Sequence, residues 1–393
     1  MSNTEPFTQK TCYQISMNPY FGGGEVYTRF LVLAFSQIGW RSVLFVHKKA
    51  RYWQQLQRLQ MPNCELLAIE DLSEIESHLP GPGQKIISHG AIDTRIRNQL
   101  AQHHRLFAMV HMPLYDFAPD SYAGYEKIFA VSAYVAASLK DAHVDNAWPE
   151  PLYAVADIQA YPPEKALQPF QKNSPYDWDK RKGRDLLCFY IEPWIRPLLP
   201  RPYYQRRSPI TLAIVSRLTP IKQFPLLFSW LAPVLAEFPH ISLDIFGAGG
   251  YASVRDLRKA LRPARAQVRF WGFQPDVALI YSHVDFVLSG LPEQEALGLN
   301  LLEAQYCNTP VLAVNAPPFT ETVVHGKTGY LYTDPRKDQG QDFRRLLQQL
   351  QDRTSWPQPY SAPEHLERFS FSTFCRRLQT TIHQLHWDQL HGG

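Results

Sequence analysis

The stretch Glu295-Ala-Leu-Gly-Leu-Asn-Leu-Leu-Glu303 places two glutamates eight positions apart around a glycine and a run of apolar residues. Gly298 has no side chain and therefore lets backbone approach a ligand closely, and the residues from Leu299 onward follow helical spacing. A helix that begins there presents unpaired N–H groups to an anion. The stretch thus predicts an anion-binding helix start, with Glu295 in the loop before it and Glu303 more than one turn into it.

The spacing of the two carboxylates suggests the size of the ligand. Eight residues at helical rise span roughly 12 Å, which is the upper end of the distance from a hexose across two phosphates to a ribose. The two glutamates would then clamp a nucleotide sugar. The same composition also fits an ordinary amphipathic helix with a solvated glutamate at each end.

The overall composition is that of a folded chain long enough for two domains. The sequence has 393 residues, of which 45% are hydrophobic and 19% charged, and this excludes a disordered protein. Lys and Arg number 40 against 36 Asp and Glu, with the excess in the second half. Such mild basicity suits anionic ligands or acidic lipid headgroups and does not indicate a nucleic-acid partner.

The cysteines and the apolar runs indicate the compartment. The cysteines are odd in number and widely spaced, so they predict neither a disulfide framework nor a zinc site: Cys12, Cys64, Cys188, Cys307 and Cys375. The N-terminus lacks the pattern of a signal peptide, and runs such as 30–35 are too short to span a bilayer. We expect a cytoplasmic protein, soluble or peripheral at the inner face of the membrane.

Short apolar runs alternate with helical or loop segments along both halves of the chain. We expect buried strands at 12–17, 42–46, 86–88, 106–110, 128–131 and 152–155, and a second set at 211–215, 241–246, 268–271, 285–289 and 310–314. The periodicity fails between Tyr161 and Pro209. The pattern predicts two facing, doubly wound, Rossmann-like α/β domains with a cleft between them, followed by a last helix marked by Phe374, Leu378, Ile382 and Leu385.

Two further groups of residues are candidates for ligand binding. Gly23 and Gly24 lie between a strand and a helix, where missing side chains permit close contact with phosphate or sugar, although a plain tight turn fits as well. Arg217 and Lys222 follow the strand at 211–215, at the edge where an open α/β sheet binds ligands. They could neutralise a departing diphosphate or be solvated surface cations.

His111 follows the strand at 106–110 and precedes Met112-Pro113. From that position it could donate a hydrogen bond into the cleft, or it could be a structural histidine.

Several motifs of other enzyme classes are incomplete. Phe246-Gly-Ala-Gly-Gly250 lacks the full dinucleotide fingerprint, and Gly326-Lys-Thr328 lacks the P-loop glycine because Glu321 stands in its place. Asp177-Trp-Asp179 resembles a metal-binding pair but lies in a basic, proline-rich connector, where a solvated loop is favoured. We predict neither a metal site nor a cofactor, only a nucleotide-sugar donor as co-substrate.

Taken in order, these motifs resemble the family 4 glycosyltransferases of the two-domain GT-B fold. The resemblance covers most of the chain and is strongest from 209 to 332. The segments that match in order and spacing are Ser216–Lys222, Phe246–Gly250, Phe270–Phe273, Glu295–Glu303, Asn308–Pro310, Glu321 and Gly326–Gly329. In the first half the resemblance rests on Gly22–Glu25 and His111.

The resemblance implies a role for each matching residue. Arg217 and Lys222 would grip the diphosphate, Glu295 would bind the sugar hydroxyls, Glu303 would hold the ribose, and His111 would contact the transferred sugar. The remaining donor-binding residues would be Gly23, Gly24, Gly247, Phe273, Gly298, Leu299 and Asn300. Ser216 and Ala296-Leu297 depart from the residues usual in the family, so the sugar pocket is expected to have an unusual shape.

The resemblance also implies an activity and a division into domains. We expect a retaining transferase that moves a hexose-type sugar from a nucleoside diphosphate sugar to the hydroxyl of a glycan, glycolipid or small molecule. The acceptor domain would be 1–195, including the connector from about 161; the donor domain 196–365; and 366–393 a helix crossing back to the first domain. The alternatives are a non-catalytic nucleotide-sugar-binding protein and an epimerase or phosphorylase on the same fold.

The connector carries an aromatic and basic stretch that could touch a membrane or a lipid-linked acceptor: Trp194, Ile195, Leu198, Leu199, Tyr203, Arg196, Arg201, Arg206 and Arg207. Prolines at 193, 197, 200 and 202 disfavour a long amphipathic helix. We therefore expect an interdomain linker packed on the core. The oligomeric state is not indicated by any pattern in the sequence.

Overall fold

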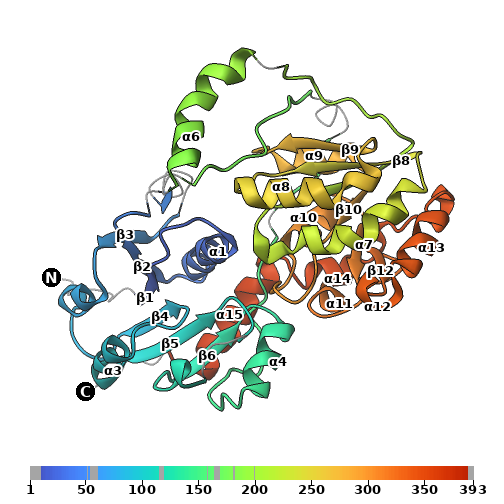
Figure 1. Cartoon of the computed structure of the whole chain (residues 1–393). Helices are drawn as coiled ribbons and strands as arrows, with labels where there is room; N and C mark the ends of the chain where they lie inside the picture. The colour runs from blue at the N-terminus through green and yellow to red at the C-terminus, as the bar shows by residue number, and fades with distance from the viewer. Residues whose placement is uncertain are drawn as a thin grey trace. The chain divides into compact units, whose positions relative to one another are not determined.

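A computed structural model describes residues 10–50, 52–53, 61–114, 119–156, 158–162, 169–179, 182–198 and 200–387. The chain divides into two compact units, one of Met1–Val155 with Glu367–Gly393 and the other of Ala156–Leu366. Each unit contains a six-stranded parallel sheet (Figure 1). Residues 156–195, which the sequence analysis assigns to the first domain, lie with the second unit.

The sheet of the first unit has the strand order β3-β2-β1-β4-β5-β6. Its strands are β1 (Thr11–Ser16), β2 (Arg41–His47), β3 (Cys64–Ile69), β4 (Lys85–His89), β5 (Arg105–Val110) and β6 (Lys127–Ala130). The main helices are α1 (Gly23–Gln37), α3 (Thr94–His103), α4 (Ala133–Asp141) and α15 (Phe371–Gln384). The chain reverses its direction of travel across the sheet between β1 and β4. In such doubly wound sheets this reversal is where ligands bind.

Helix α15 returns from the end of the second unit and packs on α1 of the first (Figure 1). Aromatic rings form the contact: Tyr27 meets Phe374 with ring centroids 5.6 Å apart, and Phe30 meets Phe371 at 6.2 Å. Beyond the helix, Trp387 packs on Phe107 of β5 at 4.7 Å. The predicted return of the C-terminal helix is confirmed, and its apolar face completes the core of the first unit.

The sheet of the second unit has the order β12-β11-β10-β7-β8-β9, with its reversal between β7 and β10. The strands are β7 (Ile210–Val215), β8 (Ile241–Phe246), β9 (Val268–Gly272), β10 (Phe286–Leu288), β11 (Val311–Val314) and β12 (Gly329–Tyr332). The helices are α6 (Gly183–Ile195), α7 (Phe224–Ala236), α8 (Tyr251–Ala260), α9 (Val277–His283), α10 (Leu299–Tyr306), α11 (Phe319–Thr322), α12 (Pro335–Asp338), α13 (Gln341–Gln349) and α14 (Pro363–Glu367). The predicted pair of Rossmann-like sheets is confirmed.

A buried carboxylate ties the connector to the second sheet. Asp244 of β8 is fully buried and accepts two hydrogen bonds of 2.7 Å from Arg269. It also accepts one from the Trp271 indole and one from the Tyr204 hydroxyl, at 3.0 and 3.1 Å. Because the charge is paired and its oxygens are satisfied, burial is tolerated. Tyr204 stacks on Phe170, so this part of the connector packs on the core as predicted.

The structure differs from the predicted elements at three places. Residues 152–155 form no strand: Leu152 and Ala154 donate single bonds to Ala130 and Val131 at the end of β6, without a continuous ladder. The edge strands β3 and β12 were not predicted, because β3 is only partly buried and β12 is four residues long. Edge strands carry a weaker apolar signal than central ones.

The third difference is helix α6, in a segment where we expected no amphipathic helix. Pro193 lies in its last turn, and the helix ends two residues later. A proline so near the end interrupts few backbone bonds. The expectation of a linker packed on the core is wrong for this segment, since Trp194 and Leu198 are exposed. Leu199 lies outside the described residues.

Candidate active site

The candidate residues of the second unit lie at the reversal of its sheet. Arg217 and Lys222 follow the carboxyl end of β7, and Glu295 lies in the loop after β10. The ammonium of Lys222 forms an ion pair and hydrogen bond with the carboxylate of Glu295. The structure therefore brings together two residues 73 positions apart, at the edge of the sheet where the sequence placed them.

The Lys222–Glu295 pair is held by local backbone structure. Lys222 ends a short 3-10 turn, Pro220–Lys222, and Gln223 follows with a positive φ of 52°. The second carboxylate oxygen of Glu295 accepts from the N–H of Ala296 at 3.3 Å. The two side chains are 25% and 16% exposed. The pair is thus partly screened from water yet open enough to meet a ligand.

Two glycines allow the loops around these candidate residues to pack closely. A β-carbon at Gly290 would lie 2.3 Å from the carbonyl oxygen of Lys222, and one at Gly247 would lie 1.8 Å from that of Ser216. Both distances are far inside van der Waals contact, so no larger residue fits. Gly247 therefore supports the loop that carries Arg217, and its predicted contact with the donor stays a prediction. Gly290 was missed, although a glycine directly after a buried strand resembles Gly247.

Helix α10 begins at Gly298, whose φ of 85° and ψ of 54° favour glycine. No side chain of the described residues caps this helix start, so the first-turn N–H groups, including those of Leu299 and Asn300, suit an anion. The Asn300 side chain donates to the carbonyl of Val215 at 3.2 Å. This bond holds the helix start beside the end of β7, where the loop of Lys222 begins.

Glu303 lies one turn further along α10 and is partly buried. The hydroxyl of Tyr281 donates to its carboxylate at 3.1 Å and lies 3.2 Å from the carbonyl of Asn300. Burial raises the pKa of Glu303 to about 6, and the bond from Tyr281 opposes this rise. Glu303 therefore titrates close to neutral pH, which a solvated glutamate would not do.

Phe273 follows β9, the edge strand two positions from β7 in the sheet. Its side chain is exposed, and its carbonyl accepts from Asn173 of the connector at 2.8 Å. The structure does not bring it to the Lys222–Glu295 pair. Its contact with a donor stays a prediction.

In the first unit, the reversal of the sheet holds a polar network that includes His111. His89 ends β4, and its Nδ1 lies 3.1 Å from Nε2 of His111 and 3.0 Å from the hydroxyl of Thr28. Its Nε2 lies 3.0 Å from Oε1 of Gln14 on β1. Gly24, in the first turn of α1, lies against the His111 ring, since a β-carbon there would be 3.7 Å from it.

The hydrogen-bond pattern assigns the protons of this network. Gln14 donates through Nε2 to Ser42 at 3.2 Å, so its Oε1 accepts from His89. Because Nε2 of His89 donates to Gln14 and Thr28 donates to the carbonyl of Gly24 at 2.9 Å, Nδ1 of His89 accepts a hydrogen bond from the Nε2–H of His111. A neutral His111 protonated at Nε2 presents a lone pair at Nδ1.

Burial keeps both histidines neutral. It lowers the pKa of His111 to about 4, and the pKa of His89 well below its ordinary value. His111 thus offers an acceptor rather than the donor expected from the sequence. Sequence reasoning missed His89, Gln14 and Thr28, because each is a single polar residue inside an apolar element and no motif marks it.

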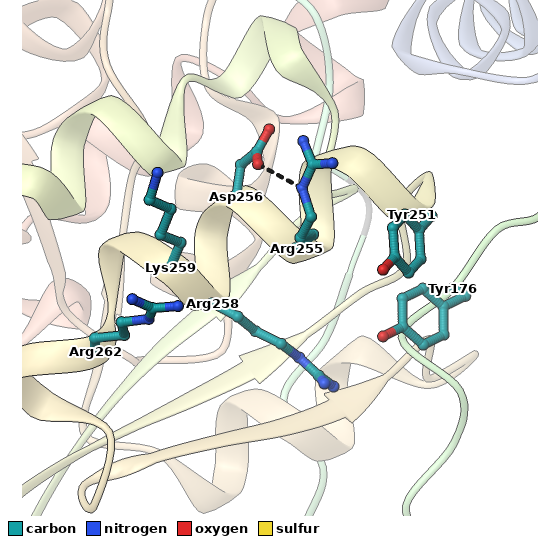
Figure 2. Close-up of a pocket in the computed structure, with 7 residues that line it drawn as sticks. All are labelled: Tyr176, Tyr251, Arg255, Asp256, Arg258, Lys259 and Arg262. Atoms are coloured by element: carbon teal, nitrogen blue, oxygen red, sulfur yellow. Dashed lines mark hydrogen bonds and ion pairs between the residues drawn. The ribbon is translucent and has the colours of Figure 1, made fainter.

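A separate pocket of about 570 Å³ lies along helix α8, away from these candidate residues. Figure 2 shows the rings of Tyr176 and Tyr251 close together at the start of the helix, with the charged side chains further along it. Its charged lining residues are Arg255, Asp256, Arg258, Lys259 and Arg262. The pocket contains none of the predicted donor-binding residues.

The described residues contain neither a metal-binding cluster nor a membrane-spanning helix. In this part of the chain no group of three or more His, Cys, Asp or Glu side chains is arranged to hold a metal ion. Asp179 of the Asp-Trp-Asp motif pairs with Lys182 at 3.7 Å. None of the helices within the described ranges has the length and apolar character needed to cross a membrane.

Comparison with known families gives a match within the second unit. Residues 201–358 match the family model described as glycosyl transferases group 1. The match covers less than half of the chain and gives residues 201–358 a likeness to group 1 glycosyltransferases. This match includes Arg217, Lys222, Glu295 and Glu303, and it confirms the resemblance inferred from the sequence motifs.

Curated relatives of this chain align over parts of their length. The alpha-1,3/1,6-mannosyltransferase ALG2 of Dictyostelium discoideum is 34% identical over 95 residues, which is 24% of this chain and 22% of that protein. The D-inositol 3-phosphate glycosyltransferase of Rhodococcus opacus is 31% identical over 173 residues, 41% of this chain and 37% of that protein. The matched stretches thus span well under half of these relatives.

Solved structures match this chain over nearly its whole length. Anabaena HepE in complex with UDP-glucose gives a TM-score of 0.68 at 15% identity, covering 95% of this chain and 99% of that one. The pneumococcal O-GlcNAc transferase GtfA in complex with UDP and GlcNAc gives 0.62 at 12% identity, with 96% and 99% covered. These likenesses show that the fold is GT-B.

Proposed function

We propose that the protein is a retaining glycosyltransferase that moves a hexose-type sugar from a nucleoside diphosphate sugar to an acceptor hydroxyl, without a catalytic metal. The observation that carries the proposal is the Lys222–Glu295 pair beside the uncapped start of α10. A cation and a helix N-terminus suit a diphosphate, and a carboxylate suits sugar hydroxyls. Few ligands other than a nucleotide sugar need all three groups.

In this mechanism the bond between the anomeric carbon and the diphosphate oxygen breaks, and the acceptor oxygen bonds to the same face of the sugar. Lys222, Arg217 and the N–H groups at the start of α10 stabilise the charge that develops on the leaving diphosphate. Stabilisation of this kind is the main catalytic contribution when the donors are already in place. The acceptor proton leaves with the departing phosphate oxygen.

The other candidate residues bind the ends of the donor. Glu295, oriented by Lys222 and by the N–H of Ala296, accepts hydrogen bonds from the transferred sugar. Glu303 accepts from the ribose in its ionised form, and the lone pair at His111 Nδ1 accepts from a sugar hydroxyl. We assign donor binding to the second unit and acceptor binding to the first.

Donor screening followed by turnover tests the proposal. Thermal unfolding is measured with uridine, guanosine and adenosine diphosphate sugars, since a bound donor raises the unfolding temperature. Uridine diphosphate sugars come first, because the HepE and GtfA structures are described as holding UDP. Release of nucleotide is then followed with candidate acceptors.

Each result bears on one alternative. Stabilisation with nucleotide release and a glycosylated product supports the proposal. Stabilisation without release, even slow release to water, would make the chain a binding protein. Conversion of the sugar without acceptor would indicate an epimerase, and release of a sugar phosphate only when phosphate is added would indicate a phosphorylase.

A further inference from the structure

Helix α6 exposes a stripe of large apolar side chains. Trp194 and Leu198 are 81% and 83% exposed, and Leu187, Tyr190 and Ile191 are exposed as well. These positions recur at intervals of three and four residues, so they lie on one side of the helix and of the turn that continues it. A contiguous apolar stripe on a surface marks an interaction site rather than ordinary surface composition.

Both carboxylates of α6 have partners, one outside the helix and one within it. Glu192 accepts a hydrogen bond from the indole of Trp178. Asp185 is buried and pairs with Arg184 at 2.8 Å. The helix thus keeps its carboxylates occupied and its apolar side outward, the reverse of a helix that covers its own core.

The α6 helix is joined to the pocket along α8 by a series of ring contacts. The guanidinium of Arg184 lies over the ring of Tyr251, 4.0 Å from its centroid. Tyr251 and Tyr176 both line the pocket and stack at 6.1 Å, and Tyr176 stacks on Trp178 at 4.7 Å. The start of α6 therefore lies beside the pocket, within the same unit as the apolar stripe.

The pocket is strongly cationic. Its lining includes Arg255, Arg258, Lys259 and Arg262 along one helix and its extension, with the carboxylate of Asp256 among them (Figure 2). Arg255 pairs with Asp256 at 2.8 Å, which leaves Arg258, Lys259 and Arg262 in excess. The guanidinium of Arg258 lies over the rings of Phe270 and Tyr176, at 4.9 and 5.8 Å. An excess of this size fits several phosphate groups.

We propose that α6 docks the protein on an anionic phospholipid surface, with the apolar stripe inserted at the headgroup boundary and the α8 pocket binding lipid phosphates. Aromatic and aliphatic side chains beside a basic patch are the recognition pattern of an interfacial helix. The adjoining cations favour an anionic lipid surface over an apolar protein partner, because such a partner would not need them. This inference goes beyond the sugar transfer proposed above, and its test does not depend on activity.

The test is flotation of the full chain with vesicles of phosphatidylcholine alone and of phosphatidylcholine with phosphatidylglycerol. We expect binding to the anionic vesicles, weakening as salt is raised. Leu187→Gln with Trp194→Gln should reduce the partition coefficient more than tenfold, since two large apolar groups no longer enter the interface. Removing charge with Arg258→Gln and Lys259→Gln should reduce it roughly thirtyfold, about fivefold for each cation.

Matched control variants test whether the loss of binding is specific to α6 and the α8 pocket or follows from removing any exposed apolar or cationic side chain. Leu226→Gln changes an exposed leucine on α7, and Lys337→Gln with Arg345→Gln removes two exposed cations on α12 and α13. These variants should float like the wild type. Circular dichroism and light scattering confirm that every variant is folded and report its size in solution.

Three results would overturn the proposal. The first is no flotation with anionic vesicles at low salt. The second is equal loss of binding in the control variants. The third is a lipid-free oligomer that the Leu187→Gln, Trp194→Gln variant dissociates, because a second copy of the chain would then cover the stripe. Binding of soluble inorganic phosphate alone, without flotation, would likewise exclude the lipid surface.

Discussion

Nδ1 of His89 lies 3.1 Å from Nε2 of His111, and the two imidazole rings stack with an angle of 13° between their planes. His89 is in turn held through Nε2 by Gln14. This arrangement determines which nitrogen of His111 carries the proton. His89 thus determines which nitrogen of His111 can accept a hydrogen bond, and we propose that His111 contacts the sugar.

Removing the ring of His89 should therefore impair His111. We expect His89→Leu to lower kcat roughly tenfold to a hundredfold, because His111 loses both its orientation and its tautomer. It should also lower the free energy of unfolding by about 1–3 kcal/mol, since the buried Gln14 amide loses a partner. Nitrogen chemical shifts of His111 measure the tautomer directly, and urea unfolding measures the stability.

The variant His89→Gln provides the control, because its side chain can still accept a hydrogen bond from His111. Partial recovery of kcat is expected. A His89→Leu protein with the wild-type His111 tautomer and normal kcat would contradict the positioning role.

The Lys222–Glu295 pair should behave as one unit in catalysis. We expect Lys222→Ala and Glu295→Ala each to reduce turnover by about a hundredfold or more, on the order of 3 kcal/mol, because each removes a contact made to the transition state. Turnover of the double variant should fall by a factor much smaller than the product of the two single-variant factors, since each residue positions the other. Initial rates with saturating donor measure the effect.

The exposed Lys337 of α12 serves as the control for removing a lysine, and Lys337→Ala should keep the wild-type rate. Near wild-type turnover in both single variants, with donor binding intact, would refute the assignment of the site.

Gly290 should tolerate no side chain. Gly290→Ala brings a methyl group to within 2.3 Å of the Lys222 carbonyl, so the two loops must separate. We expect a loss of about 1–3 kcal/mol in stability and a weaker donor affinity, because Lys222 is displaced from Glu295. Thermal unfolding and donor titration check both effects.

Gly250 is a matched position, with nothing within 4 Å of its β-carbon and an ordinary φ of −59°. Gly250→Ala should change stability by less than about 1 kcal/mol, because alanine is the poorer N-cap but also lowers the entropy of the unfolded chain. If Gly290→Ala proved equally mild, the close approach of the two loops would not be needed in solution.

Glu303 should make stability and donor binding respond oppositely to pH. Its pKa is raised from 4.5 to about 6, so the folded chain holds this proton more tightly than the unfolded one. Its contribution to stability is therefore favourable at low pH and is lost as the pH rises from about 4.5 to 6, by about 2 kcal/mol. Donor affinity should rise over the same range, because the ribose hydroxyls need an ionised acceptor.

Glu303→Gln removes the titrating group and keeps an oxygen for Tyr281. We expect this variant to be about 1–2 kcal/mol more stable than the wild type at pH 7.5, to lose the change between pH 4.5 and 6, and to bind donor roughly tenfold more weakly. Urea unfolding and donor titration at pH 5 and 7.5 measure these quantities. A wild-type chain whose donor affinity is constant across this range would contradict the role of Glu303.

Much of the fold, and the grouping of several candidate site residues, could be predicted from the sequence. The central strands of both sheets are continuous apolar runs, and runs of that kind alternating with helical spacing leave few arrangements besides doubly wound parallel sheets. Arg217, Lys222 and Glu295 lie in the loops that follow such strands. Because the carboxyl ends of parallel strands share one edge of the sheet, local patterns alone predict that these residues lie near one another.

Other features depend on contacts between distant segments, which no local pattern records. Gly290 is essential because the backbone of Lys222 lies against it, and the proton on His111 depends on Gln14, His89 and Thr28 from three other elements. The exposure of the apolar stripe on α6 is of the same kind, since amphipathic spacing does not say which side of a helix faces the core.

The stretch from Glu295 to Glu303 shows the same division. Its own residues determined a glycine-started helix with a carboxylate at each end, because backbone conformation and helical spacing are local properties. Only the tertiary structure gave the two carboxylates different chemistry. Glu295 forms an ion pair with Lys222, whereas Glu303 is buried beside Tyr281, and burial raises its pKa to about 6. Charge pairing and burial are set by which segments the fold brings together.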